Sequence, residues 1–147
     1  MKYLSPKISL LSDRRSQGDS IRYDSVALCY GHFNVIHPGH LRYFNQARTR
    51  GDHLIVALEG DHSLTSDERK NSFNEIERAE AIAALDLVDE VVVLNDGILI
   101  DLVKILTPAL LVLGKEFERE RSIKVKGAIE LMESIGGQVV YEAGEAR

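Results

Sequence analysis

Two histidines, His37 and His40, stand three residues apart in the stretch GHFNVIHPGH, residues 31–40. The stretch follows the apolar run SVALCY, residues 25–30, and Pro38 suits the first turn of a helix. Side chains three apart at a helix start lie on one face, so both imidazoles can face one anion. Imidazole donates a hydrogen bond or carries charge near neutral pH, which suits phosphate oxygens that gain charge during transfer. Residue types and spacing therefore predict a phosphate-directed catalytic site.

The neighbours of the two histidines allow the backbone to turn sharply. Gly31 lets the backbone approach a ligand, Asn34 tolerates unusual dihedral angles, and Gly39 removes a side chain between the imidazoles. In an open α/β sheet, ligands bind at the carboxyl ends of strands, where helix N-termini point amide groups outward. We expect the histidine stretch to lie at such a strand end.

The rest of the chain alternates between two kinds of apolar pattern. Runs rich in Val, Ile and Leu are typical of buried parallel strands and occupy residues 25–30, 53–59, 88–95, 109–114 and 138–142. Helical patterns lie between them, at residues 38–51, 75–86, 98–106 and 122–137. This order predicts an α/β fold, a Rossmann-like doubly wound parallel sheet of about five strands. We expect residues 1–24 to form an N-terminal extension and residues 25–147 to form the domain.

Composition narrows the function classes. With 147 residues, 44% hydrophobic and 28% charged, the chain fits one globular domain. A net charge of -5 argues against a nucleic-acid partner, because neutralising phosphates requires clustered Lys and Arg. Cys29 is the single cysteine and cannot form an internal disulfide, so the cytoplasm is the expected compartment. No apolar window approaches a membrane span, so no membrane partner is expected.

The histidine stretch resembles the HxGH signature of the cytidylyltransferase-like nucleotidyltransferases, whose usual form is G-x-F-[DN]-x-x-H-x-G-H. The matching positions are Gly31, Phe33, Asn34, His37, Gly39 and His40. The segments ERAEAIAALDLVDEVVVLND, residues 77–96, and PALLVLGKEF, residues 108–117, resemble further family motifs in the expected order. The resemblance covers roughly residues 25–142 and is nearest to the glycerol-3-phosphate cytidylyltransferases and heptose-1-phosphate adenylyltransferases.

The resemblance implies a reaction. A phosphate of a phosphorylated sugar or polyol attacks the α-phosphate of CTP or ATP, pyrophosphate leaves, and no covalent enzyme intermediate forms. Mg²⁺ is expected with the NTP, because it neutralises the triphosphate. A homodimer is a possible assembly. The resemblance assigns catalysis to His37, His40 and Lys70, nucleotide binding to Gly31, His32, Phe33, Asn34, Gly39 and Arg69, and acceptor binding to Asp61 and Lys115.

Several of these residues have plainer alternatives. Arg69 and Lys70 lie in the charged loop SDERKN, and a solvated surface loop explains either one about as well. Long loops at a strand's carboxyl end are often functional, which favours a phosphate-binding role for the pair. Lys115 stands in the family's G-x-D segment, where an extra cation favours a more anionic acceptor, although a surface lysine is the simpler explanation. For Arg78 we expect a structural or loop-anchoring role.

Other functions stay open at this point. A metal site at the two histidines lacks further ligands at a suitable spacing, so we expect no protein-bound metal. A phosphopantetheine-type or nicotinamide-mononucleotide-type adenylyltransferase shares the histidine signature, but the segment 77–96 argues against it. A non-catalytic nucleotide-binding module of a longer protein is the alternative of another class. The family's Ser/Thr-rich segment after the last strand is missing from AGEAR, residues 143–147, so we expect a truncated, weakly catalytic piece.

Overall fold

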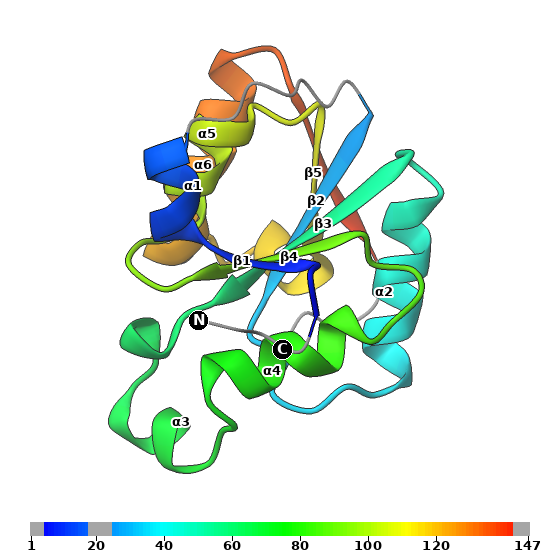
Figure 1. The fold of residues 1–147 in the computed structure, drawn as a ribbon. Coiled ribbons are helices and arrows are strands. Elements are labelled where there is room, and N and C mark those ends of the chain that lie inside the picture. The colour runs from blue at the N-terminus through cyan, green and yellow to red at the C-terminus, as the bar shows by residue number, and fades with distance from the viewer. Residues whose placement is uncertain (1–4, 18–24, 143–147) are drawn as a thin grey trace.

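The computed structural model describes residues 5–17 and 25–142 and contains one parallel sheet in the order β1-β4-β3-β2-β5-β6. Figure 1 shows this sheet in the middle of the molecule with helices on both sides. The strands are β1 (Ile8–Leu10), β2 (Val26–Gly31), β3 (His53–Glu59), β4 (Glu90–Leu94), β5 (Leu110–Gly114) and β6 (Gln138–Glu142). The Rossmann-like α/β prediction is confirmed, with six strands in place of about five.

The helices divide between the two faces of the sheet. One core layer packs beneath α2 (Pro38–Arg48) and α4 (Glu75–Ala83), and the other packs beneath α1 (Leu11–Gln17), α5 (Leu99–Leu106) and α6 (Ile123–Ser134). Successive strand residues point to opposite faces, so Cys29 belongs to the first layer while Leu28 and Tyr30 belong to the second. Both faces are therefore buried, which explains the continuous apolar runs.

The predicted N-terminal extension needs a correction. Residues 8–10 form β1, which pairs in parallel with Val91–Val93 of β4 as a sixth strand at the sheet edge. Ile8 packs into one core layer and Leu11 into the other, so the run ISLL belongs to the domain rather than preceding it. A three-residue strand is too short to give a period-two pattern, so the sequence offered little sign of it.

The strand order creates a reversal point beside β2. Helices that follow β2 and β3 cover one face, whereas those that follow β4 and β5 cover the other. The carboxyl ends of β2 and β5 are neighbours, and the chain leaves them in opposite directions. In open α/β sheets this geometry produces the ligand-binding crevice.

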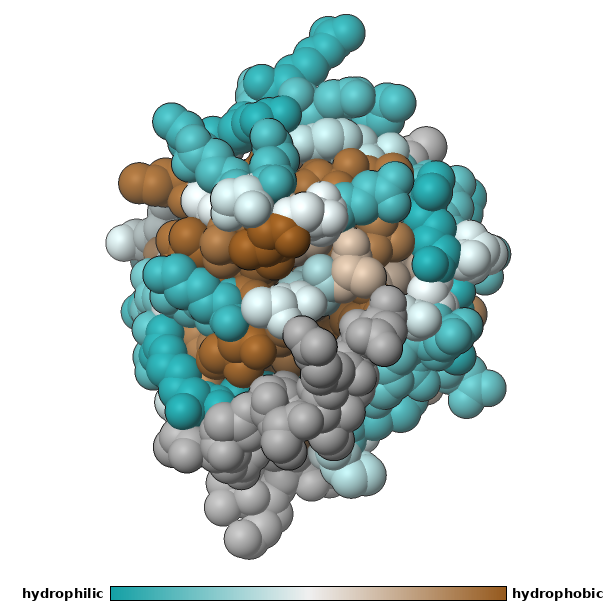
Figure 2. Space-filling view, turned by 90° about the horizontal axis from the view of Figure 1, so that it is seen from above, coloured by the Kyte–Doolittle hydropathy of each residue, from teal (hydrophilic) through white to brown (hydrophobic). Residues whose placement is uncertain are grey.

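Three short helical elements lie in the connections that leave the carboxyl edge of the sheet. They are η1 (Asp61–Ser63), α3 (Ser66–Lys70) and η2 (Lys115–Glu118). The view from above in Figure 2 looks at the end of the molecule away from α3, where hydrophobic residues reach the surface among hydrophilic ones. Within the described residues, no helix is long and apolar enough to cross a membrane.

Candidate active site

The histidine turn connects β2 to α2 and is organised by imidazole caps. His37 is the N-cap of α2, and its Nδ1 accepts a hydrogen bond from the Gly39 amide at 3.0 Å. His40 returns the cap, since its Nδ1 accepts from the His37 amide at 3.2 Å. The two rings stack with centroids 3.7 Å apart and planes 28° apart. The predicted juxtaposition of His37 and His40 is present in the structure.

These caps fix the tautomer of each neutral imidazole. A backbone amide only donates, so each Nδ1 must carry the lone pair that accepts. In the neutral ring, the proton then lies on Nε2. In the neutral form both histidines therefore carry the proton on Nε2; their rings stack, with His40 fully buried and His37 partly exposed. Charge that develops on a phosphate oxygen is stabilised by donors preorganised in this way.

Phe33 has a different role from a ligand-contacting side chain. Its φ of 47° is left-handed, which is uncommon for a bulky residue and is associated with functional turns. The side chain is fully buried and meets the His40 ring edge-on, with centroids 5.1 Å apart. The Phe44 ring also packs against Phe33, with ring centroids 5.0 Å apart. Phe33 therefore supports the His40 ring, and any contact with a nucleotide must come from its backbone.

Asn34 and His32 fasten the turn to the long loop that follows β3. The Asn34 side chain donates to the Asn71 carbonyl at 3.2 Å and accepts from the Phe73 amide at 2.7 Å. The His32 Nε2 lies 3.1 Å from the Ser72 hydroxyl. Burial, assisted by the nearby guanidinium of Arg78, lowers the pKa of His32 and favours its neutral form. The side chains of these two residues, both predicted to bind nucleotide, thus hold two loops together.

Arg78 binds several segments at the carboxyl edge of the sheet. Its side chain is fully buried. Its guanidinium donates to the carbonyls of His32 at 2.9 Å, Glu59 at 2.8 Å and Phe73 at 2.9 Å. A fourth bond, at 2.9 Å, goes to the Asp61 carboxylate. The arginine joins the ends of β2 and β3 to the loop, which agrees with the expected anchoring role.

Asp61 is engaged by the protein rather than left open to substrate. Its Oδ1 accepts from Arg78, and its Oδ2 accepts from the Glu75 amide at 3.1 Å, at the start of α4. The Asp61 carbonyl accepts from the Arg69 Nε at 2.9 Å. Asp61 and Arg69 nevertheless line one pocket of about 230 Å³, completed by Ser72, Phe73 and Asn74. The structure brings these two predicted residues together.

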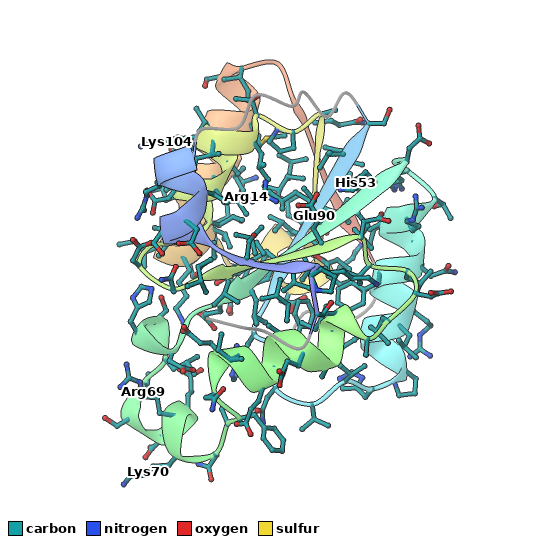
Figure 3. The ribbon with its side chains drawn as sticks, in the orientation of Figure 1. Arg14, His53, Arg69, Lys70, Glu90 and Lys104 are labelled. Atoms are coloured by element: carbon teal, nitrogen blue, oxygen red, sulfur yellow. The ribbon has the colours of Figure 1, made fainter. Side chains whose placement is uncertain are left out.

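The two remaining predicted cations, Lys70 and Lys115, are exposed at the ends of short helical elements. Lys70 is exposed at the end of α3 and points away from the sheet in Figure 3, next to Arg69. In Figure 1, α3 and the first turn of α2 lie far apart along the carboxyl edge. Lys115 is exposed at the start of η2, where its ammonium lies 3.8 Å from Glu118. Gly31 ends β2 as expected and is buried beside Leu58 of β3.

Sequence reasoning missed a charged cluster on the other side of the sheet. The buried Glu59 ends β3, and its Oε2 lies 2.6 Å from the Lys124 ammonium and 3.3 Å from the Tyr30 hydroxyl. Burial and the adjacent carboxylate raise the pKa of Tyr30 well above its ordinary value, so it stays a phenol. One signal was readable beforehand: Lys124 occupies the first turn of α6, where the helix dipole disfavours a cation.

Metal ligands are not gathered within the described ranges. No group of three or more His, Cys, Asp or Glu side chains in residues 5–17 and 25–142 is arranged to hold a metal ion. An ion that accompanies a triphosphate takes its ligands chiefly from phosphate oxygens and water.

The fold, with the histidine turn at its reversal point, defines an α/β domain of the Rossmann-like type. A lipopolysaccharide core biosynthesis protein from Thermoplasma volcanium superposes with a TM-score of 0.63 at 20% identity, covering 82% of this chain and 98% of that one. Pantoate-β-alanine ligase from Francisella tularensis gives 0.62 at 17% identity, covering 92% and 66%. At these identities the likeness concerns the fold alone.

The chain belongs to the cytidylyltransferase-like family, whose model matches residues 28–139. It is accordingly a domain of the nucleotidyltransferase class. The bifunctional protein HldE of Geotalea uraniireducens is 38% identical over 125 residues, which is 84% of this chain and 25% of that protein. The HldE of Pelobacter propionicus is 33% identical with the same coverage. The chain thus spans about a quarter of the length of these relatives.

Proposed function

We propose that this domain transfers a nucleoside monophosphate from CTP or ATP to the phosphate of a sugar or polyol and releases pyrophosphate. The observation that carries the proposal is the pair of stacked imidazoles. In each ring, Nδ1 accepts a hydrogen bond from a backbone amide. The family match supports nucleotidyl transfer, and the resemblance of residues 25–142 to the glycerol-phosphate and heptose-phosphate enzymes supports the acceptor class.

The chemistry needs positioning rather than a nucleophilic side chain. An oxygen of the acceptor phosphate bonds to the α-phosphorus, while the bond from that phosphorus to the β-bridging oxygen breaks and its electron pair leaves with pyrophosphate. The Nε2–H groups of His37 and His40 donate to oxygens that gain charge in this step. Neither imidazole gains or loses a proton overall. The helix start at Gly39 and His40 contributes the positive end of a dipole.

Arg69 is the cation best placed to bind a phosphate in the loop pocket, because its side chain is exposed there. Lys70 would reach the reacting phosphates only if α3 moved. Mg²⁺ would neutralise the triphosphate, and the protein offers it no ligand cluster within the described residues. A cytoplasmic location and a homodimer remain predictions that cell fractionation and light scattering test.

Pyrophosphate release tests the function directly. The 147-residue chain is assayed with CTP, ATP, GTP and UTP against glycerol 3-phosphate, hexose 1-phosphates and a heptose 1-phosphate, with phosphopantetheine and nicotinamide mononucleotide as comparison acceptors. Release with one NTP and one of these acceptors supports the proposal. Release only with phosphopantetheine or nicotinamide mononucleotide would contradict the acceptor class, and no release with any pair would contradict the transfer itself.

The histidine roles are tested by His37→Ala and His40→Ala. We expect each to lower kcat by about 10²- to 10³-fold, the usual loss for one preorganised donor, with a smaller change in the KM for NTP. His53→Gln is the matched control, because His53 lies at the amino end of β3 beside Glu90 in Figure 3. Parental turnover in both alanine variants would refute the assignment.

A further inference from the structure

The cluster of Glu59, Tyr30 and Lys124 lies on the carboxyl edge of the sheet, on the face away from α2. Tyr30 pairs with Ala57, so the Tyr30 side chain lies diagonally beside Glu59 on the same face. The ring of Phe117, from η2, lies 6.0 Å from the Tyr30 ring. The cluster is therefore bordered by the ends of β2 and β3, by η2 and by the first turn of α6.

The cluster also borders the histidine turn. Glu59, Glu68 and Lys124 all act electrostatically on His32, the residue that opens the turn. Arg78 binds the carbonyl of His32 and the carbonyl of Glu59, which ties the two strand ends together. The charged cluster and the two imidazoles are thus placed on either side of one backbone junction, at the crevice where this fold binds ligands.

Stability alone does not account for such a cluster. The Glu59 side chain is only 8% exposed, so its charge has lost most of its water. A buried ion pair commonly stabilises a fold no better than apolar side chains of similar volume. The lysine also occupies the helix turn that least favours a cation. The cluster lies instead at the carboxyl ends of β2 and β3, where an open α/β sheet binds its ligands.

We propose that Glu59, Tyr30 and Lys124 bind the hydroxyl-bearing part of the acceptor, an inference that rests on the proposed function. A buried carboxylate accepts charge-assisted hydrogen bonds from sugar or polyol hydroxyls. The Lys124 ammonium is one third exposed and has three donors, of which Glu59 uses one. The remaining donors can bind hydroxyl or phosphate oxygens. The rings of Tyr30 and Phe117 offer an apolar wall for the C–H side of a sugar.

The selectivity of the enzyme follows from this arrangement. An acceptor that carries hydroxyls next to its phosphate satisfies the desolvated carboxylate, whereas a bare alkyl phosphate leaves it without that partner. A site built to hydrogen-bond a hydroxyl rejects the analogue that lacks it. We therefore expect the parent to prefer glycerol 3-phosphate or a sugar phosphate over propyl phosphate, in kcat/KM.

The decisive variants are Glu59→Gln, Tyr30→Phe and the double variant Glu59→Gln/Lys124→Met. Glu59→Gln should raise the acceptor KM by about 10- to 100-fold, the effect of losing hydrogen bonds to a charged group. The KM for NTP should stay within about twofold, and the preference over propyl phosphate should shrink in parallel. The double variant removes both charges, so it keeps the test available if a single change leaves a buried charge that prevents folding.

Two matched controls separate binding from packing. Lys126→Met changes an exposed lysine two residues further along α6. Glu90→Gln removes the carboxylate that pairs with Arg14 and His53 at the amino edge of the sheet (Figure 3). Both should keep the parental acceptor KM. An unchanged acceptor KM and an unchanged preference in a folded Glu59 variant would overturn the inference while leaving the transfer activity standing. If the parent transfers to none of the acceptors, the inference falls together with the proposed function.

Discussion

Replacing Arg78 with Met removes one buried guanidinium and leaves four hydrogen-bond acceptors without their donor. The side chain is fully buried, and it binds the carbonyls of His32, Glu59 and Phe73 as well as the Asp61 carboxylate. Methionine preserves much of the aliphatic stem but donates no hydrogen bond. The carbonyls at the ends of β2 and β3 would then lack the donor that joins them.

The expected loss of stability is large. A buried group left without its hydrogen-bond partner costs about 1–3 kcal/mol, and Arg78→Met leaves three carbonyls and the partly exposed Asp61 carboxylate without their donor. We therefore expect a loss of about 3–5 kcal/mol. The free energy of unfolding of a native domain is only about 5–15 kcal/mol, so the variant should lose a substantial part of it. For a domain of this size, the corresponding drop in Tm is about 6–20 °C.

Urea unfolding followed by circular dichroism measures the effect, and Arg69→Met serves as the control. Arg69 is exposed and donates a hydrogen bond to the Asp61 carbonyl, so its loss should cost under about 1 kcal/mol. Arg78→Lys should fall between the two, because an ammonium keeps the charge without the planar fork. If Arg78→Met unfolds within about 1 kcal/mol of the parent, the anchoring role argued from the structure is wrong.

Three further results are expected. Because burial lowers the pKa of His32, the unfolded chain takes up its proton first as the pH falls below about 6.5, so stability should drop on acidification. His32→Gln should flatten that drop between pH 7.5 and 5.5 in urea unfolding, and equal slopes would exclude the effect. Arg69→Ala should raise the KM for NTP or acceptor with Tm unchanged, whereas Lys70→Ala should change neither KM nor Tm. If steady-state kinetics show the larger rise in KM for Lys70→Ala, Lys70 is the phosphate ligand and this expectation is wrong. Burial raises the pKa of the Cys29 thiol to about 12, so a disulfide reagent should label it only in denaturant, and rapid labelling of the native protein would contradict its burial.

Local patterns in the sequence predicted most of the fold. Long apolar runs identified β2 to β6, because strands buried on both faces leave a continuous signal. The spacing of His37 and His40 predicted that the imidazoles would face one site, since a helix start fixes the relative direction of residues three apart. β1 was missed because three residues carry no usable period.

Polar partnerships across the sheet were harder to predict. Asn34 and Asp61 were assigned to ligands, but their side chains bind loop and helix backbone in the folded chain. Glu59 and Lys124 are 65 residues apart in the sequence. They meet only because the strand order places β3 and β5 on either side of one strand, β2. Strand order depends on the whole fold, so such contacts do not show in a local pattern. The expectation about the segment after β6 falls on residues 143–147, outside the described residues.

The guanidinium of Arg78 also bears on how the chain reaches its native state. It closes loops back to His32, 46 residues earlier, and to Glu59, 19 residues earlier. Contacts distant along the chain form only after the entropy of loop closure has been overcome, so this junction cannot form locally. During synthesis, the histidine turn remains without its anchor until the whole segment through α4 has emerged. Nucleotide binding should therefore appear together with the cooperative folding of residues 26–83, and amides at the junction should exchange with solvent through the same opening.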